Sequence, residues 1–213
     1  ETKLTDNITW NIGADLRTYY GTHFRQVENF HGLTSWTEDR RLKDDDDNRT
    51  GATVDVIATE SGKANPWAAT FNTMDEAQRI DYDNSERISY GGLFTQLEYS
   101  DDIVSAFFQG SVSNQWHQRF DRYDYPDTLE DSEKISNFGY NVKAGIGLQV
   151  SESSNVYFNT GFYSRQPYHD NIFNNYDNSI NPLSQNEKIT GIELGYNYRS
   201  DKFSANVNLY STT

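Results

Sequence analysis

The sequence of 213 residues lacks cysteine altogether, holds only 4 prolines and 1 methionine, and contains no long apolar run. Without cysteine the chain can form neither a disulfide framework nor a thiol site. A transmembrane helix needs about 20 consecutive apolar residues, and no stretch approaches that length. The sequence therefore excludes a helical membrane protein. It does not exclude a β-barrel, whose strands need only about 10 residues of alternating character.

Basic residues are also scarce, with 18 Lys and Arg against 32 Asp and Glu and a net charge of -14. No basic stripe could neutralise phosphates, so no nucleic-acid partner is expected. The sequence has no HExxH, GxSxG, Walker or GxGxxG motif, and its carboxylates form no distinctive pair. We therefore expect no enzyme.

The start, Glu1-Thr2-Lys3-Leu4, lacks the apolar segment of a signal peptide, so we expect a processed chain or one that begins within a longer protein.

Aromatic residues are abundant, with 15 Tyr, 12 Phe and 4 Trp, and apolar and polar residues alternate with a period of two. Between Phe138 and Val150 every even position is apolar, whereas the odd positions hold Asn, Gly, Lys or Gln. This period is typical of β-strands. The pattern predicts seven strands, over residues 7–26, 87–99, 103–116, 136–150, 155–165, 189–198 and 203–212.

The connections between these strands alternate strictly between short and long. Three are tight turns, and three are long, at about 27–86, 117–135 and 166–188. Outer-membrane barrels have short periplasmic turns and long extracellular loops. The fold expected for the chain is therefore an all-β, antiparallel transmembrane β-barrel segment in a bacterial outer membrane, bounded by outer-membrane lipids. Seven strands cannot close alone, because an unpaired edge in lipid leaves backbone groups unsatisfied, so the rest of the same barrel must come from elsewhere.

The alternative is a soluble sandwich whose apolar face packs on a second sheet. Strands in globular proteins are usually near 5 to 6 residues, whereas several segments here are about twice as long. The opposite face is rich in Gly, Asn, Ser and Thr rather than Lys and Glu. This composition favours a crowded polar lumen over open solvent.

The first long loop contains the acidic cluster Asp44, Asp45, Asp46 and Asp47, which could hold a hard cation such as calcium. The spacing departs from an EF-hand loop: counted from Asp46, the glycine falls correctly at Gly51 but the closing carboxylate is replaced by Ile57. A solvated acidic loop without metal is the alternative, and no other cofactor is expected.

Aromatic residues near the loops form a candidate ligand-binding group, because rings supply large contact area at low entropic cost. Packing of the loops on each other is the alternative role. Four histidines lie at or near the predicted outer rim without metal-ligand spacing, and a composite site in three dimensions stays open for them. The aromatic residues are Trp36, Trp67, Trp116, Tyr123, Tyr125, Tyr168, Phe173 and Tyr176, and the histidines are His23, His31, His117 and His169.

A specific pattern near the C-terminal end contains Glu187-Lys188 and Glu193-Leu194-Gly195-Tyr196, followed by Phe203-Ser204-Ala205-Asn206-Val207-Asn208-Leu209-Tyr210. This pattern, and with it nearly all of the chain, resembles barrel segments of TonB-dependent outer-membrane receptors of the Bacteroidetes branch, whose members often carry an N-terminal carboxypeptidase-regulatory-like domain. The segments Gly13-Ala14-Asp15-Leu16-Arg17, Tyr20-Gly21-Thr22-His23-Phe24-Arg25 and Phe162-Tyr163-Ser164-Arg165-Gln166-Pro167 are similar to other parts of that barrel.

The resemblance implies a 22-stranded barrel with a plug, which takes up a scarce nutrient with energy from the inner-membrane TonB complex. This chain would supply barrel wall and outer loops, while the plug and TonB box are absent from it. The ligand stays open between siderophore, vitamin, glycan and peptide, and glycan or peptide importers commonly add a surface lipoprotein lid. A non-transporting barrel scaffold that binds partner proteins through its loops is the alternative function. A passive porin is a third.

Overall fold

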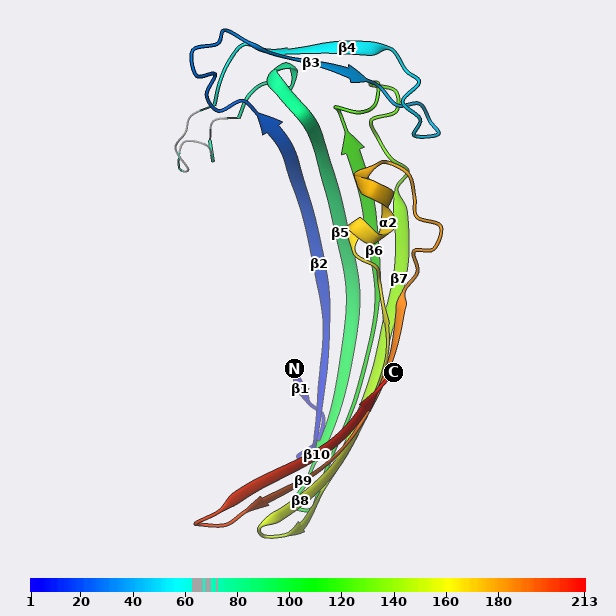
Figure 1. The fold of residues 1–213 in the computed structure, drawn as a ribbon. Helices are drawn as coiled ribbons and strands as arrows, with labels where there is room; N and C mark the ends of the chain where they lie inside the picture. The colour runs from blue at the N-terminus through cyan, green and yellow to red at the C-terminus, as the bar shows by residue number, and fades with distance from the viewer. Residues whose placement is uncertain (63–66, 68–69, 72) are drawn as a thin grey trace.

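The computed structural model describes residues 1–62, 67, 70, 71 and 73–213 and is dominated by one long, strongly curved antiparallel sheet (Figure 1). The strand order is β1-β2-β5-β6-β7-β8-β9-β10. These strands are β1 (Thr2–Lys3), β2 (Ile8–Gln26), β5 (Arg79–Ser100), β6 (Val104–Asp121), β7 (Ile135–Ser151), β8 (Ser154–Arg165), β9 (Glu187–Arg199) and β10 (Ser204–Thr212). Each of the seven long strands pairs with its neighbour in sequence, so the expectation of an all-β, antiparallel fold is confirmed.

The elements outside this sheet lie in two of the long connections. A separate hairpin, β3 (Trp36–Arg41) with β4 (Thr53–Ala58), and the short helix η1 (Glu76–Gln78) lie between β2 and β5. The helices α2 (His169–Ile172) and η2 (Asn174–Tyr176) lie between β8 and β9. Among the residues that the structure describes, no helix has the length and apolar character needed to cross a membrane.

Two strands extend well beyond their predicted ends. β5 begins at Arg79 rather than at residue 87, and β6 continues to Asp121 rather than ending at residue 116. The added parts consist mostly of polar residues, with only Ile80, Tyr82 and Phe120 apolar or aromatic, so no sustained period of two marks them even though their ladders are continuous from Asn84↔Asp121 onward. The two-residue strand β1, which folds back onto the start of β2, was also not predicted.

The two faces of the sheet differ sharply in chemistry. Directly opposed residues of antiparallel strands point to the same face, so Leu97, Phe108 and Ala144 share one face and Gln96, Gln109 and Lys143 share the other. The first face is apolar across β2 to β10. Its exposed members include Leu16, Leu93, Val112, Val142, Phe158, Ile192 and Leu209.

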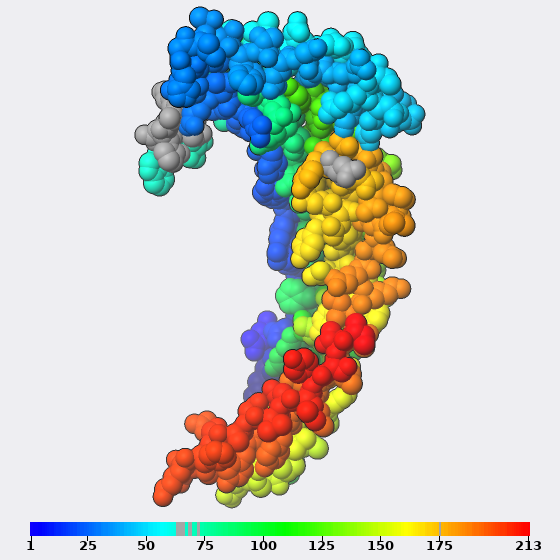
Figure 2. Space-filling view, in the orientation of Figure 1, coloured from blue at the N-terminus to red at the C-terminus, as the bar shows by residue number. Residues whose placement is uncertain are grey.

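The buried apolar core lies in the loop layer rather than on the sheet. Val56, Ala58, Ile80 and Tyr123 form a cluster under the β3–β4 hairpin, with Val27 and Phe30 packed against it. Figure 2 shows this layer as a mass at one end of the crescent, opposite the short turns. The layer closes that end of the polar face, whereas the apolar face of the strands remains uncovered.

Glycines on the polar face make room for aromatic rings from the neighbouring strand. Gly13 lies opposite Phe94, Gly145 opposite Phe107 and Gly195 opposite Tyr157, and in each pair a Cβ on the glycine would overlap the ring. The Tyr157 hydroxyl also donates to Asn208 Oδ1 at 2.7 Å. The small residues expected for a crowded polar face thus let rings lie flat against the backbone.

Replacing Gly195 by alanine is expected to lower the free energy of unfolding by about 1–3 kcal/mol, because the new methyl group displaces the Tyr157 ring. The matched control is Gly191→Ala in the same strand, where an added Cβ meets no atom within 4 Å. That change should stay within about 0.5 kcal/mol. Denaturant unfolding of both variants checks this, and equal values for the two would contradict the close fit of ring and glycine.

Candidate functional site

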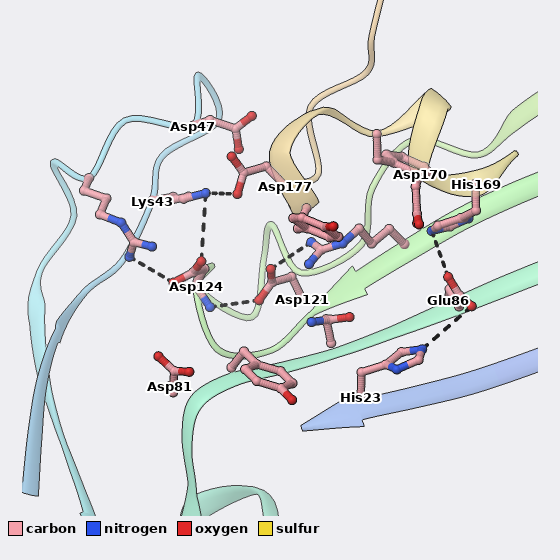
Figure 3. Close-up of a pocket in the computed structure, with 16 residues that line it drawn as sticks. His23, Lys43, Asp47, Asp81, Glu86, Asp121, Asp124, His169, Asp170 and Asp177 are labelled. Atoms are coloured by element: carbon pink, nitrogen blue, oxygen red, sulfur yellow. Dashed lines mark hydrogen bonds and ion pairs between the residues drawn. The ribbon is translucent and has the colours of Figure 1, made fainter. Parts of the chain in front are cut away.

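A cavity of about 1050 Å³ lies between the polar face of the sheet and the loop layer (Figure 3). Its floor comes from the upper ends of β2, β5 and β6, which the register brings side by side: His23 pairs with Asn84, which pairs with Asp121, and Glu86 pairs with Arg119. Its roof comes from the first loop, the β6–β7 connection and the α2–η2 segment. The lining residues are His23, Lys43, Asp47, Arg49, Asp81, Tyr82, Asn84, Glu86, Arg119, Asp121, Asp124, His169, Asp170, Phe173, Tyr176 and Asp177.

Two of the four histidines contact one carboxylate, and a third contacts one of these two. His23 Nε2 lies 3.7 Å from one oxygen of Glu86, and His169 Nε2 lies 3.5 Å from the other. The Nδ1 atoms of His117 and His169 are 3.3 Å apart. His23, His117 and His169 thus lie near one another, whereas His31 lies in the first loop, among exposed residues. A composite metal site of histidines stays a prediction.

Helix α2 places His169 against the sheet. The His169 ring is 8% exposed and lies 4.8 Å, centroid to centroid, from the Phe173 ring. Burial lowers the pKa of His169 to about 4, and the neighbouring His117 acts in the same direction. The imidazole is therefore uncharged at neutral pH, and it cannot neutralise Glu86.

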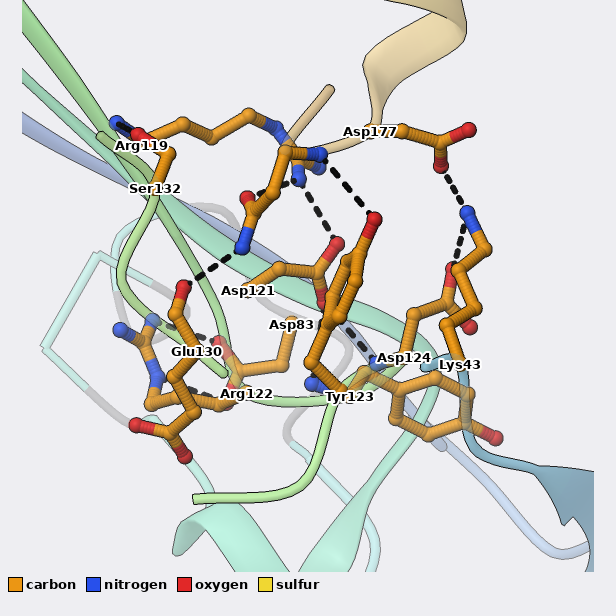
Figure 4. A network of polar contacts seen from close by, with 12 residues as sticks. Lys43, Asp83, Arg119, Asp121, Arg122, Tyr123, Asp124, Glu130, Ser132 and Asp177 are labelled. Carbon is orange, nitrogen blue, oxygen red and sulfur yellow. Dashed lines mark hydrogen bonds and ion pairs between the residues drawn. The ribbon is translucent and has the colours of Figure 1, made fainter. Parts of the chain in front are cut away.

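A network of buried ion pairs ties the loops to the strand ends (Figure 4). Asp83 accepts hydrogen bonds from Arg79 at 2.6 Å and from Arg122 at 2.8 Å. Arg119 donates to Asp121 at 2.8 Å and to Asn178 at 3.1 Å, which joins β6 to the connection between β8 and β9. Because ion pairs this deep lose most of their solvation, each partner must remain in place.

Lys43 joins the first loop to the same network. Its ammonium group contacts Asp177, lies 3.9 Å from Asp124 and sits over the Tyr125 ring. The lysine is 6% exposed, so its charge is compensated inside the loop layer. Three loops distant in sequence are thereby held together by one buried cation.

The eight candidate aromatic residues fall into four groups. Phe173 and Tyr176 line the cavity, the first buried and the second exposed. Tyr123 and Tyr125 are buried among the loops, which fits the loop-packing alternative, and Trp116 lies within β6 on the apolar face rather than in a loop. Trp36, Trp67 and Tyr168 are exposed and do not line the cavity.

Tyr123 shows what the buried rings do. Its hydroxyl donates to Glu38 of β3, and the Arg40 guanidinium lies 4.4 Å from the centre of its ring. Burial and the adjacent Glu38 raise the pKa of Tyr123 to about 12. The neutral phenol therefore acts as a fixed donor that docks the β3–β4 hairpin on the β6–β7 connection.

The acidic cluster forms a turn around its first member. The Asp44 carboxylate accepts hydrogen bonds from Asp46 N at 3.0 Å, Asn48 N at 2.9 Å and Thr50 Oγ1 at 2.7 Å, and these bonds lower its pKa. Asp45 and Asp46 are exposed, whereas Asp47 lines the cavity. Within the described part of the chain, no three His, Cys, Asp or Glu side chains are arranged to hold a metal. Calcium binding by this loop stays a prediction.

Comparisons with protein families, with curated proteins and with solved structures find no match for this chain. The candidate site therefore rests on its geometry. Sequence reasoning had not singled out Glu86, Lys43, Arg119, Asp121 or Asp170 as site residues. The alternation of β5 and β6, continued as far as Glu86, Arg119 and Asp121, places these three side chains on the polar face. The sequence could not indicate this, because the predicted strands stopped short of these residues.

Proposed function

We propose that this chain is part of the barrel wall of a TonB-dependent receptor in a bacterial outer membrane, which takes up a scarce nutrient such as a glycan, peptide or siderophore. The observation that supports this most is the two-faced sheet: apolar side chains are exposed along one face of the long strands, while loops roof one end of the polar face. Lipid would cover the apolar face, and the polar face would line the lumen.

The height of the apolar face supports this proposal. On β7 it extends from Phe138 to Val150, which corresponds to about 40 Å along the strand at roughly 3.3 Å per residue. Tilted by about 40°, as barrel strands are, this length spans about 30 Å, the usual thickness of the hydrocarbon core of a bilayer. Trp10 and Tyr99 lie near the turn end of this face, and the Tyr99 hydroxyl donates to Asp101 in the turn. Interfacial aromatic residues behave in this way.

Further strands are part of the proposal. Among the described residues, no strand pairs with the outer edge of β10, and β1 covers only Thr9 and Trp10 of β2. Backbone groups at such edges need partners inside a bilayer, and the rest of the same barrel would supply them. Its plug would contact the TonB complex, and a surface lipoprotein is a candidate partner for the loops.

Cysteine labelling in intact cells tests the location and orientation, because the chain has no cysteine of its own. Leu183→Cys lies at an exposed loop position between β8 and β9, and Glu152→Cys lies in the exposed turn between β7 and β8. A membrane-impermeant maleimide should label the loop variant in intact cells and the turn variant only after the outer membrane is opened. Labelling of both in intact cells, or the reverse pattern, would falsify the proposed orientation.

Growth on defined nutrients separates an importer from a barrel scaffold. A strain without the protein and a strain without TonB should both lose growth on the same glycan, peptide or iron chelate. That shared loss would also identify the ligand class. A scaffold would leave growth on every single nutrient unchanged, and this outcome would remove the transport proposal while keeping the barrel.

A further inference from the structure

The cavity below the outer loops carries more negative charge than its own cations neutralise. Seven carboxylates line it, against the fixed cations Lys43, Arg49 and Arg119. Four of the seven are paired with a cation: Asp121 with Arg119, Asp124 with Arg49, Asp177 with Lys43, and Asp81 with Arg25 from outside the lining.

The remaining three carboxylates have no permanent cation. Within the part of the chain that the structure describes, no lysine or arginine forms an ion pair with Asp47, Glu86 or Asp170. Glu86 contacts the imidazoles of His23 and His169, whereas Arg119, opposite it on β6, is bonded to Asp121 and Asn178. The lining cations are already engaged, so the cavity has no free site for an anion. Its charge favours a cationic ligand.

A buried nitrogen without a hydrogen-bond partner, Nε2 of His169, also lies beside Glu86 in this cavity. His169 lines the cavity and is 8% exposed, yet its Nε2 makes no hydrogen bond. Glu86 Oε2 lies 3.5 Å away, beyond a good hydrogen bond. If His169 donates its Nδ1 proton to His117, its Nε2 carries a lone pair next to the carboxylate, and one donor group that bridges the two atoms from the side can bond to both. In the other tautomer, Glu86 still lacks a charged donor.

We propose that this cavity binds a ligand through protonated primary amines, with Glu86 and His169 Nε2 holding one ammonium group and Asp170 and Asp47 attracting others. The inference rests on the proposed function only for the outward placement of the cavity. An ammonium group provides three donors and a full positive charge. One such group would bond to Glu86 and His169 Nε2, and others would neutralise the unpaired carboxylates of Asp47 and Asp170. The exposed Tyr176 ring at the cavity wall offers a face for the aliphatic part of the ligand.

Calorimetry of the complete detergent-solubilised protein with three tripeptides tests this proposal. Trilysine should bind, whereas trilysine acetylated on its amines and triglutamate should not. Glu86→Gln and Asp170→Asn should each weaken trilysine binding about tenfold, which corresponds to about 1.4 kcal/mol. Asp170 is exposed and has no side-chain partner among the described residues, so its substitution leaves the fold intact.

Asp201→Asn is the matched control, because it removes one carboxylate from the turn at the opposite end of the sheet. It should leave trilysine affinity within about twofold, and raising the salt concentration should weaken binding of the unsubstituted protein. Equal binding of acetylated trilysine, preference for triglutamate, or identical affinity of the Asp170 and Asp201 variants would overturn the inference. Failure of the labelling pattern in cells would instead remove the barrel orientation and leave this binding result standing.

Discussion

Replacing Val142 by arginine is expected to destabilise the complete barrel by about 2–4 kcal/mol, the usual cost of a cationic side chain on the lipid-facing side near the bilayer midplane. Val142 lies midway along the apolar band of β7, between Gly110 and Phe162 of the adjacent strands, and is 42% exposed. Urea unfolding of the protein in lipid vesicles measures this cost. An exposed valine on a soluble protein would instead tolerate arginine within about 0.5 kcal/mol.

The matched control for Val142→Arg is Gln96→Arg. Gln96 lies at the same depth, in the cross-strand row with Gln109 and Lys143, but on the polar face. Its side chain already donates to Glu98, and an arginine would keep that partner. The control should therefore change the free energy of unfolding by less than about 1 kcal/mol. If both variants were equally stable, the apolar face would not be in contact with lipid.

The sequence predicted the strands where the two faces differ and failed where they do not. The period of two located β7 because Phe138 to Val150 alternates without a break, and the structure gives Ile135–Ser151. It missed the outer part of β5 because the alternation that begins at Ile80 and Tyr82 stops at Asn84 and Glu86, which are polar like their neighbours. The β3–β4 hairpin was missed because its pairing buries only one small cluster against the loop layer.

The candidate site was only partly accessible to sequence reasoning for a different reason. His23, His117 and His169 come from β2, β6 and α2, and nothing in their sequence spacing shows that His23 and His169 meet at Glu86 or that His117 lies against His169. Strand register brings the first two onto one face, and helix α2 adds the third by folding over that face. Local patterns predict which face a residue occupies, whereas loop docking depends on long-range pairs such as Lys43 with Asp177.

Replacing Asp83 by asparagine is expected to cost about 3–5 kcal/mol, because it removes the buried carboxylate that two guanidinium groups share and leaves them only the exposed Glu76 in common among the described residues. The Asp83 side chain is 4% exposed, and the side chains of Arg79 and Arg122 are 12% and 15% exposed. Arg122 also donates its backbone N–H to the Asp83 carbonyl and its side chain to Ser85. Because these contacts join the β6–β7 connection to β5, the loss should open the loop layer and leave the strands paired.

Hydrogen exchange of the backbone amides in residues 119–134 measures this opening and should accelerate by about two to four orders of magnitude. Asp81→Asn is the control two residues earlier in β5, since among the described residues Asp81 forms an ion pair only with the exposed Arg25, and its side chain is 48% exposed. Asparagine also tolerates the positive φ of 66° at this position. The control should shift exchange less than tenfold. Equal exchange in the two variants would mean that the apolar cluster at Val56 and Tyr123, rather than the buried ion pairs, holds the loops over the cavity.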